Sequence, residues 1–287
     1  MKIAVCIKQM AQTYAGTGKE PENNFLADID RIFRINPYDE VAMEMAVRLK
    51  KDIDGLWITA VILGPVIAKD ELARCLALGA DDVLQIETDA PATDPWQKSG
   101  ILAAALKDIL PDIVLCGKES LDSQNGQVGA FLSRHLDWGF VSAACRLSVN
   151  PDTRQAMVHR NGGRGIREIF DCALPVVISV DLSDIEPHIP GYEEKKQARA
   201  MKFKTMKIPL DMIPPARVIG QECYPPRPRP KPGAVIHPQL DSYARIRQLL
   251  SPAGIQKKGA VKKGDPQMLA DELISFLKEN DFLKVRR

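Results

Sequence analysis

The first 187 residues alternate short apolar runs with segments of helical periodicity, and this alternation constrains the fold more than any other feature. Residues 2–7 form an almost continuous apolar run, which is typical of a strand buried on both faces of a parallel sheet. Strands that alternate with helices predict an α/β fold with a doubly wound, mostly parallel sheet. Further strands are expected at 57–63, 82–86, 113–116 and 175–181, and helices at 39–51, 68–78, 95–109 and around 131–136.

Two stretches depart from this alternation. Residues 9–24 are polar and contain two glycines, so we expect a loop there. Residues 146–149, 157–160 and 168–171 form short, polar β-like runs. Such runs favour an antiparallel ribbon over strands of the parallel core.

Charge and composition both change near residue 187. Residues 1–187 carry 19 Lys+Arg against 27 Asp+Glu, whereas residues 188–287 carry 20 against 10 and hold 12 of the 21 prolines. The proline run at 224–232 predicts a stiff, polyproline-like spacer. The second part has few apolar runs and cannot bury much core by itself.

These differences predict three parts with different roles. Residues 1–187 form an α/β domain, residues 188–264 a basic, proline-rich arm that binds partners, and residues 265–287 a C-terminal segment. Apolar residues at helical spacing predict an amphipathic helix over 266–283. Because a linker isolates this helix, its apolar face needs a partner surface.

Several classes of function are disfavoured by what the sequence lacks. There is no apolar stretch of about 18 residues that could span a membrane. The six cysteines form no Cys-x-x-Cys pair and the four histidines have no metal-ligand spacing, so we expect reduced thiols, no metal and a cytoplasmic location. No Gly-x-Ser-x-Gly elbow or nucleic-acid-binding module occurs, so neither a serine hydrolase nor a nucleic-acid partner is expected.

The segment from Cys116 to Gly129 has the pattern most typical of a ligand site. It leaves an apolar strand, passes through small and polar residues and enters a helix, and ligands of open parallel sheets bind at such strand ends. Amides at a helix N-terminus suit phosphate oxygens, and three glycines permit close approach of the backbone. The segment matches neither Gly-x-Gly-x-x-Gly nor Gly-x(4)-Gly-Lys-Ser/Thr, so an ordinary polar loop is the alternative.

The second candidate is the segment from Ile35 to Glu40. Asn36 and Pro37 are typical of a helix start, and acidic residues are favoured in a first turn. A simple helix cap and a contribution to a ligand site therefore both remain open.

Taken in order, these segments resemble the β subunit of electron-transfer flavoproteins, over residues 1–210 and more weakly over 265–283. The resemblance is carried by Val5-Cys6-Ile7-Lys8-Gln9, Asn36-Pro37-Tyr38-Asp39-Glu40, Ala77-Leu78-Gly79-Ala80-Asp81, the 116–129 segment, Leu174-Pro175-Val176-Val177 and Glu186-Pro187. It implies a Rossmann-like, adenine-nucleotide-binding α/β fold.

The resemblance also implies a cofactor and a partner subunit. The pocket would hold AMP in most members and a second FAD in electron-bifurcating members, while an α subunit would supply most of the site for the electron-carrying FAD. The complex would carry electrons from flavin-dependent dehydrogenases or NADH to downstream acceptors, and NADH oxidation would need the α subunit. The pocket would be lined by Cys6, Asn36, Pro37, Tyr38, Asp39, Leu63, Gly117, Asp122, Ser123, Gln124, Asn125, Gly126, Gln127 and Val128.

Some positions depart from the family pattern or divide its members. Residues 127–129 and 207–211 look closer to bifurcating members, whereas Gln124 stands where an acidic residue is usual. In the segment that resembles the family's partner-recognition loop, Tyr192 replaces the usual leucine anchor. We therefore expect a redox partner other than a standard acyl-CoA dehydrogenase.

Two other functions fit the same fold class. One is a stand-alone adenine-nucleotide-sensing module of the universal-stress-protein type, which would need no α subunit. The other is an adenylating enzyme with a Ser-Gly-Gly-x-Asp-Ser loop after its first strand. Here Lys8-Gln9-Met10 occupies that place, which disfavours the adenylating enzyme.

Overall fold

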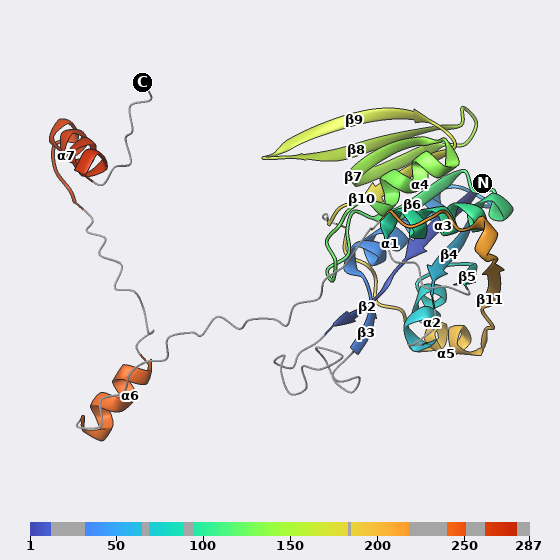
Figure 1. Cartoon of the computed structure of the whole chain (residues 1–287), viewed down its shortest axis with the longest axis horizontal. Helices are drawn as coiled ribbons and strands as arrows, with labels where there is room; N and C mark the ends of the chain where they lie inside the picture. The colour runs from blue at the N-terminus through green and yellow to red at the C-terminus, as the bar shows by residue number, and fades with distance from the viewer. Residues whose placement is uncertain are drawn as a thin grey trace. The chain divides into compact units, whose positions relative to one another are not determined.

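The structure is a computed structural model of the whole chain (Figure 1). It describes residues 1–12, 32–64, 69–88, 94–182, 185–217, 240–250 and 262–279. The chain divides into two compact units, Met1–Pro226 and Arg227–Arg287, which are considered separately.

A nine-stranded sheet forms the centre of the first unit, in the order β11-β5-β4-β1-β6-β10-β7-β8-β9. Its strands are β1 (Lys2–Ile7), β4 (Trp57–Leu63), β5 (Asp82–Thr88), β6 (Ile113–Gly117), β7 (Gly139–Asn150), β8 (Gln155–Gly163), β9 (Ile166–Ala173), β10 (Val176–Val180) and β11 (Lys204–Ile208). Neighbours from β11 to β7 pair in parallel, and β7, β8 and β9 pair antiparallel. The predicted mostly parallel sheet and its antiparallel ribbon are therefore confirmed.

Helices cover both faces of this sheet. They are α1 (Pro37–Asp52), α2 (Lys69–Ala77), α3 (Pro95–Ile109), α4 (Val128–Leu136) and α5 (Tyr192–Ala200). Alternate residues of β1 enter different cores: Val5 packs in one cluster with side chains of α1 and α2, and Ala4 packs in another with side chains of α3 and α4. Burial on both faces explains why β1 is a continuous apolar run instead of an alternating one.

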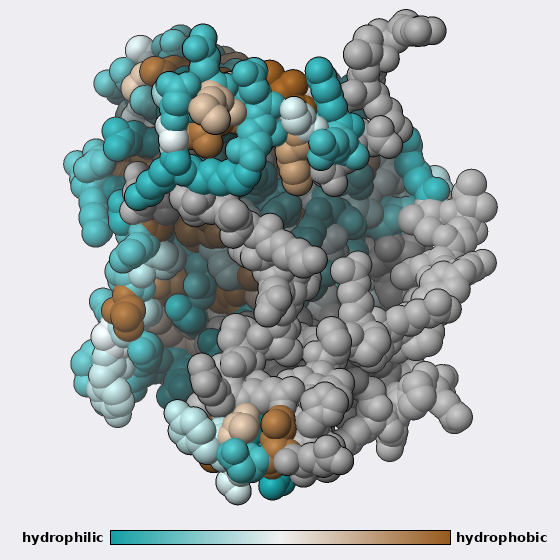
Figure 2. Space-filling view, turned by 90° about the vertical axis from the view of Figure 1, so that its left-hand side faces the viewer, coloured by the Kyte–Doolittle hydropathy of each residue, from teal (hydrophilic) through white to brown (hydrophobic). Residues whose placement is uncertain are grey.

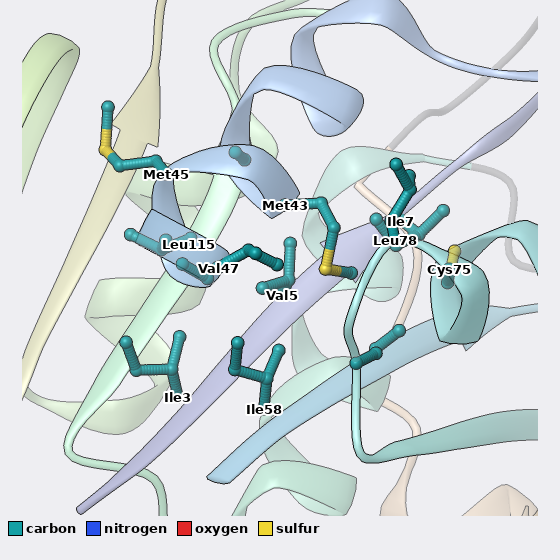
Figure 3. Packing of buried hydrophobic residues seen from close by; sticks show 14 of the residues in the cluster. Ile3, Val5, Ile7, Met43, Met45, Val47, Ile58, Cys75, Leu78 and Leu115 are labelled. Carbon is teal, nitrogen blue, oxygen red and sulfur yellow. The ribbon is translucent and has the colours of Figure 1, made fainter. Parts of the chain in front are cut away.

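The α1 side of the sheet is packed mainly by apolar side chains. Met43 and Val47 of α1 lie over Val5 of β1, with Ile58 of β4 and Leu115 of β6 in the same cluster (Figure 3). Ile58 and Leu115 have no exposed surface. This packing fixes the strand ends relative to α1, on which the candidate site depends.

One prediction near the N-terminus is wrong in part. Residues 9–12, expected to be loop, form strand β2 (Gln9–Gln12), which pairs antiparallel with β3 (Ile32–Ile35). Met10 and Ile35 are buried, so this polar run carries apolar side chains where the hairpin meets the core. The rest of the predicted loop, residues 13–24, lies outside the described residues.

The first unit continues beyond residue 187. Helix α5 buries Ala198 in the core, and β11 pairs with β5 to become the edge strand of the sheet. A short 3₁₀ helix (Leu210–Met212) follows β11. Residues 192–208, expected in a separate arm, therefore belong to the same compact unit as the α/β domain. The assignment of partner binding to residues 188–264 stays a prediction.

The second unit contains helices α6 (Ser242–Leu250) and α7 (Pro266–Glu279). The predicted C-terminal helix is confirmed over 266–279, and residues 280–283 lie outside the described residues. Helix α7 has no buried residue, and Met268, Leu273 and Phe276 are exposed. The proline run at 224–232 also lies outside the described residues.

Other predictions concern membranes, metals and thiols. None of the helices in the described ranges combines the length and apolar character needed to cross a bilayer. The described surface shown in Figure 2 is mainly hydrophilic, with scattered apolar residues. The described cysteines are free thiols, and the described residues form no His/Cys/Asp/Glu group suited to a metal ion. Cys223 lies outside the described residues.

The central strands should dominate stability. Ile58→Ala removes a side chain that is 0% exposed, whereas Ile166→Ala makes the same change in β9 where the side chain is 57% exposed. We expect Ile58→Ala to lower the free energy of unfolding by roughly 2–5 kcal/mol, measured by urea denaturation. The Ile166→Ala variant should lose less than about 1 kcal/mol. Equal losses in both variants would contradict the burial described here.

Candidate functional site

A cavity of about 750 Å³ lies at the carboxyl ends of the central parallel strands. Cys6 of β1, Leu63 of β4, Thr88 of β5 and Gly117 of β6 all line it. The starts of α3 and α4 complete its wall through Pro95, Lys98, Gln127 and Val128. Open α/β sheets bind their ligands at this edge, so the cavity is the candidate site.

The structure brings most of the predicted site residues together at this cavity. The predicted residues that line it are Cys6, Asn36, Asp39, Leu63, Gly117, Ser123, Asn125, Gly126, Gln127 and Val128. Pro37, Tyr38, Asp122 and Gln124 do not line it. Tyr192 begins α5 and is 77% exposed, away from the cavity lining.

The buried carboxylate of Asp39 joins three elements around the cavity. Its Oδ2 accepts a hydrogen bond of 2.8 Å from the backbone amide of Lys8, directly after β1. Its Oδ1 accepts one of 2.8 Å from the amide of Gly117, at the end of β6. Asp39 lies in the first turn of α1, so this one side chain fixes α1 to both strand ends.

Asn36 holds the loop that follows β6 instead of capping its own helix. It occupies the N-cap position of α1, but its side chain makes no cap hydrogen bond. Its Nδ2 donates to the carbonyl of Glu119 at 2.8 Å, and its Oδ1 accepts from the amide of Leu121 at 3.4 Å. Nearby, the Tyr38 hydroxyl donates to Glu119 Oε1 at 3.1 Å. The start of α1 is therefore part of the site.

Gly117 is required by the closeness of α1. A Cβ at this position would lie 2.3 Å from Asp39 Oδ1 and 2.7 Å from Tyr38 Cβ. Such distances cannot be relieved by a flexible side chain end alone, because Tyr38 Cβ is held by the helix. Glycine thus permits the Asp39 contact that positions the loop.

Lys8 also orders the loop after β6, a role in the site that the sequence prediction did not include. Its Nζ donates to Asp122 Oδ1 at 2.7 Å and to Ser120 Oγ at 3.0 Å. Burial tends to raise the pKa of Asp122, but the hydrogen bonds from Lys8 and its neighbours outweigh burial and lower the pKa. Asp122 therefore helps to order the loop through Lys8, and it is not among the residues that line the cavity.

The start of α4 leaves backbone donors next to the cavity. Gln127 occupies the N-cap and makes no side-chain cap hydrogen bond. The preceding Gly126 has a φ of +60°, which places the chain in a left-handed turn at the cavity wall. Free amides at a helix start, combined with the helix dipole, suit an anionic group such as phosphate.

The two buried cysteines of the site are unsuited to act as nucleophiles. Burial raises the pKa of the Cys6 thiol to about 12, and nearby Asp39 adds to this effect. Burial also raises the pKa of Cys116 well above its usual range. Both thiols are therefore protonated at neutral pH and are poor nucleophiles.

Several lining residues were absent from the sequence prediction. Glu87 and Thr88 end β5, and Lys98 lies in the first turns of α3. Lys118, Glu119 and Ser120 also line the cavity, and they lie within the Cys116–Gly129 segment that the sequence singled out. The rule that ligands bind beyond strand ends could have found residues 87 and 88, but it gives no signal for a residue within a helix.

This fold and cavity define an α/β protein with a candidate ligand site at the carboxyl edge of its sheet. Over residues 26–209, more than half of the chain, the sequence matches the electron transfer flavoprotein domain. The chain therefore belongs to the electron transfer flavoprotein family. Its similarity to curated β subunits of that family identifies it as a β subunit.

Three of these relatives show how far the similarity extends. The chain is 31% identical over 229 residues to electron transfer flavoprotein subunit beta of Syntrophomonas wolfei subsp. wolfei, which covers 77% of this chain and 88% of that protein. It is 27% identical over 252 residues to protein FixA of Azotobacter vinelandii (82% and 88%). It is 25% identical over 255 residues to the human subunit beta (87% and 98%).

Substituting Gly117 tests the close approach of α1 to the loop. Gly117→Ala should lower the free energy of unfolding by roughly 1–3 kcal/mol, because the added Cβ clashes with Asp39 and Tyr38. Gly139→Ala is the matched control, since its Cβ would meet Val176 at an ordinary 3.8 Å. Chemical denaturation of both variants measures the difference. If Gly117→Ala were no less stable than Gly139→Ala, the clash would be refuted.

Asp39 should make stability depend on pH. Burial raises its pKa from 3.8 to about 7, although the amides of Lys8 and Gly117 act in the lowering direction. Between these two pH values the folded chain binds a proton that the unfolded chain releases, so the free energy of unfolding falls as the pH rises towards 7. This decline should be weaker in Asp39→Asn. Urea unfolding at several pH values between about 4 and 8, a range that spans most of the shift, measures the difference. Parallel profiles for both proteins would show that Asp39 does not titrate there.

Proposed function

We propose that the cavity binds an adenine nucleotide and that the chain works as the nucleotide-binding β subunit of an electron-carrying αβ complex. The main support for this proposal is the loop at 117–128, which Asp39, Asn36 and Lys8 hold at the carboxyl edge of the sheet. That loop delivers the uncapped start of α4 to a cavity of about 750 Å³. A cavity of this size is ordinary for a nucleotide or cofactor.

The residues present suit such a ligand. Leu63 and Leu102 offer apolar contacts for an adenine ring, and the amides at the start of α4 offer donors for phosphate. At Gly117 the backbone passes so close to α1 that any side chain at this position would collide with that helix. No nucleophile is needed for this role, in agreement with the protonated thiols.

The ligand is AMP or a second FAD. A bound flavin would supply electron transfer, whereas AMP would have a structural role. The resemblance of residues 127–129 and 207–211 to bifurcating members supports FAD. Gln124, the position that departs from the family pattern, does not line the cavity, so this departure leaves the lining unchanged.

The second unit is proposed to contact the α subunit, which would hold most of the electron-carrying FAD. Helix α7 buries none of its residues and exposes Met268, Leu273 and Phe276. Relatives of this chain are named as subunits, which implies an assembly. The free thiols suit a cytoplasmic complex.

The composition of the native complex tests this function. Native mass spectrometry of the chain purified with its α subunit should show a heterodimer with one adenine nucleotide bound in the β subunit. AMP plus one FAD would indicate a simple electron carrier, and two FAD molecules a bifurcating complex. A chain that stays alone with a bound adenine nucleotide would support a stand-alone sensor instead. A heterodimer whose β subunit holds no nucleotide would refute the proposed binding role.

Tyr192 is proposed as the apolar anchor for a redox partner other than a standard acyl-CoA dehydrogenase. It is 77% exposed at the start of α5, on the same compact unit as the cavity. Tyr192→Ala should weaken association with the partner roughly 10- to 100-fold, as for an aromatic interface anchor. Tyr243→Ala, which removes a 76% exposed tyrosine from α6, is the matched control. Unchanged electron transfer from the genuine partner to Tyr192→Ala, at limiting concentrations, would refute this role.

A further inference from the structure

Lys98 lies in the first turns of α3 and lines the cavity, as do residues of the 117–128 loop. Its helix start is firmly held: Asp94 Oδ1 accepts from the amide of Gln97 at 2.8 Å, and Asp94 Oδ2 accepts from the amide of Arg217 at 2.5 Å. The side chain of Gln97 also donates to the carbonyl of Pro214 at 3.2 Å. Lys98 is therefore carried by a fixed part of the first unit.

Among the described residues, three lysines line the cavity, and they differ in their partners. Lys8 pairs with Asp122 at 2.7 Å, and Lys118 pairs with Asp181 at 3.3 Å. Within the part of the chain that the structure describes, the ammonium of Lys98 has no hydrogen bond or ion pair. It is a cation that lines the cavity without a carboxylate paired to it.

The surroundings of Lys98 make this lack of a partner costly. Burial lowers the pKa of Lys98, and the charge of Lys8 lowers it further, against weaker opposing effects of Asp122 and Asp94. A half-buried charge gains most from an anion that replaces its lost hydration. Glu87, which also lines the cavity, already accepts a hydrogen bond from Gln85 at 3.0 Å.

We propose that Lys98 binds a phosphate group of the adenine nucleotide, together with the amides at the start of α4. The inference rests on the proposed nucleotide binding and adds the group that makes the site select a phosphorylated ligand. Two kinds of donor then act on one anion: backbone amides fixed by the 117–128 loop, and an ammonium fixed by α3. Adenosine, which lacks the phosphate, would leave both without a partner.

The affinity for AMP relative to adenosine measures this selectivity. Titration calorimetry would use the full chain, freed of nucleotide, with AMP and adenosine as the probes. Lys98→Met keeps most of the apolar stem and should weaken AMP binding roughly 10- to 100-fold, the usual range for a charge-assisted hydrogen bond, with little effect on adenosine. Lys98→Arg should retain most of the preference for AMP because it keeps the positive charge.

Lys107→Met is the matched control, because Lys107 lies on the same helix in its exposed last turn. This variant should bind both ligands as the unsubstituted chain does. The ³¹P resonance of bound AMP should also shift in Lys98→Met and not in Lys107→Met, which a purely structural effect at α3 would not produce. An unchanged AMP-to-adenosine ratio in Lys98→Met would overturn the role of Lys98 while leaving nucleotide binding intact. If the unsubstituted chain bound AMP, adenosine and FAD equally poorly, both proposals would fail.

Discussion

The Asp39 carboxylate organises the candidate site. It belongs to α1, and it accepts hydrogen bonds from the amide that follows β1 and from the amide that ends β6. A buried carboxylate is costly unless hydrogen bonds offset its lost hydration. Here those bonds come from the two strand ends that must lie together for a cavity to form between them. The loop after β6 depends on this link, and Asn36 and Lys8 then hold the loop at two further points.

The boundary near residue 187 separates charge more clearly than it separates structure. Helix α5 and strand β11 follow that boundary, yet they pack on α2 and pair with β5. Tyr192, the proposed partner anchor, therefore belongs to the compact unit that contains the cavity. For an electron carrier, this arrangement would place the proposed docking residue and the proposed nucleotide site in one compact unit. The basic second unit would then be available to contact the α subunit.

The sequence predicted the central fold because each inner strand is buried on both faces and so is apolar throughout, as Ile3–Ile7 shows. It failed where local composition and tertiary context disagree. Strand β2 is polar, and its partner β3 lies about 20 residues away along the chain. The edge strand β11, Lys-Thr-Met-Lys-Ile, is largely exposed and resembles an ordinary polar linker.

The same contrast applies to the site. Residues 117–128 could be predicted because a glycine-containing segment between an apolar strand and a helix is typical of ligand sites in parallel sheets. Lys98 could not, because a lysine on a helix is usually a solvated surface residue, and only the packing of α3 brings it to the cavity. The role of Asp39 was likewise ambiguous, since an acidic residue in a first helical turn is favourable without any ligand.

Hydrogen exchange at the backbone amides of residues 117–128, measured with and without AMP, tests the central claim most directly. If AMP binds in the cavity, the amides of this loop and of the first turn of α4 should exchange more slowly when it is present. The antiparallel strands β8 and β9 serve as the internal reference and should not change. Slower exchange confined to other parts of the chain, or no change at any amide, would contradict the proposed nucleotide site.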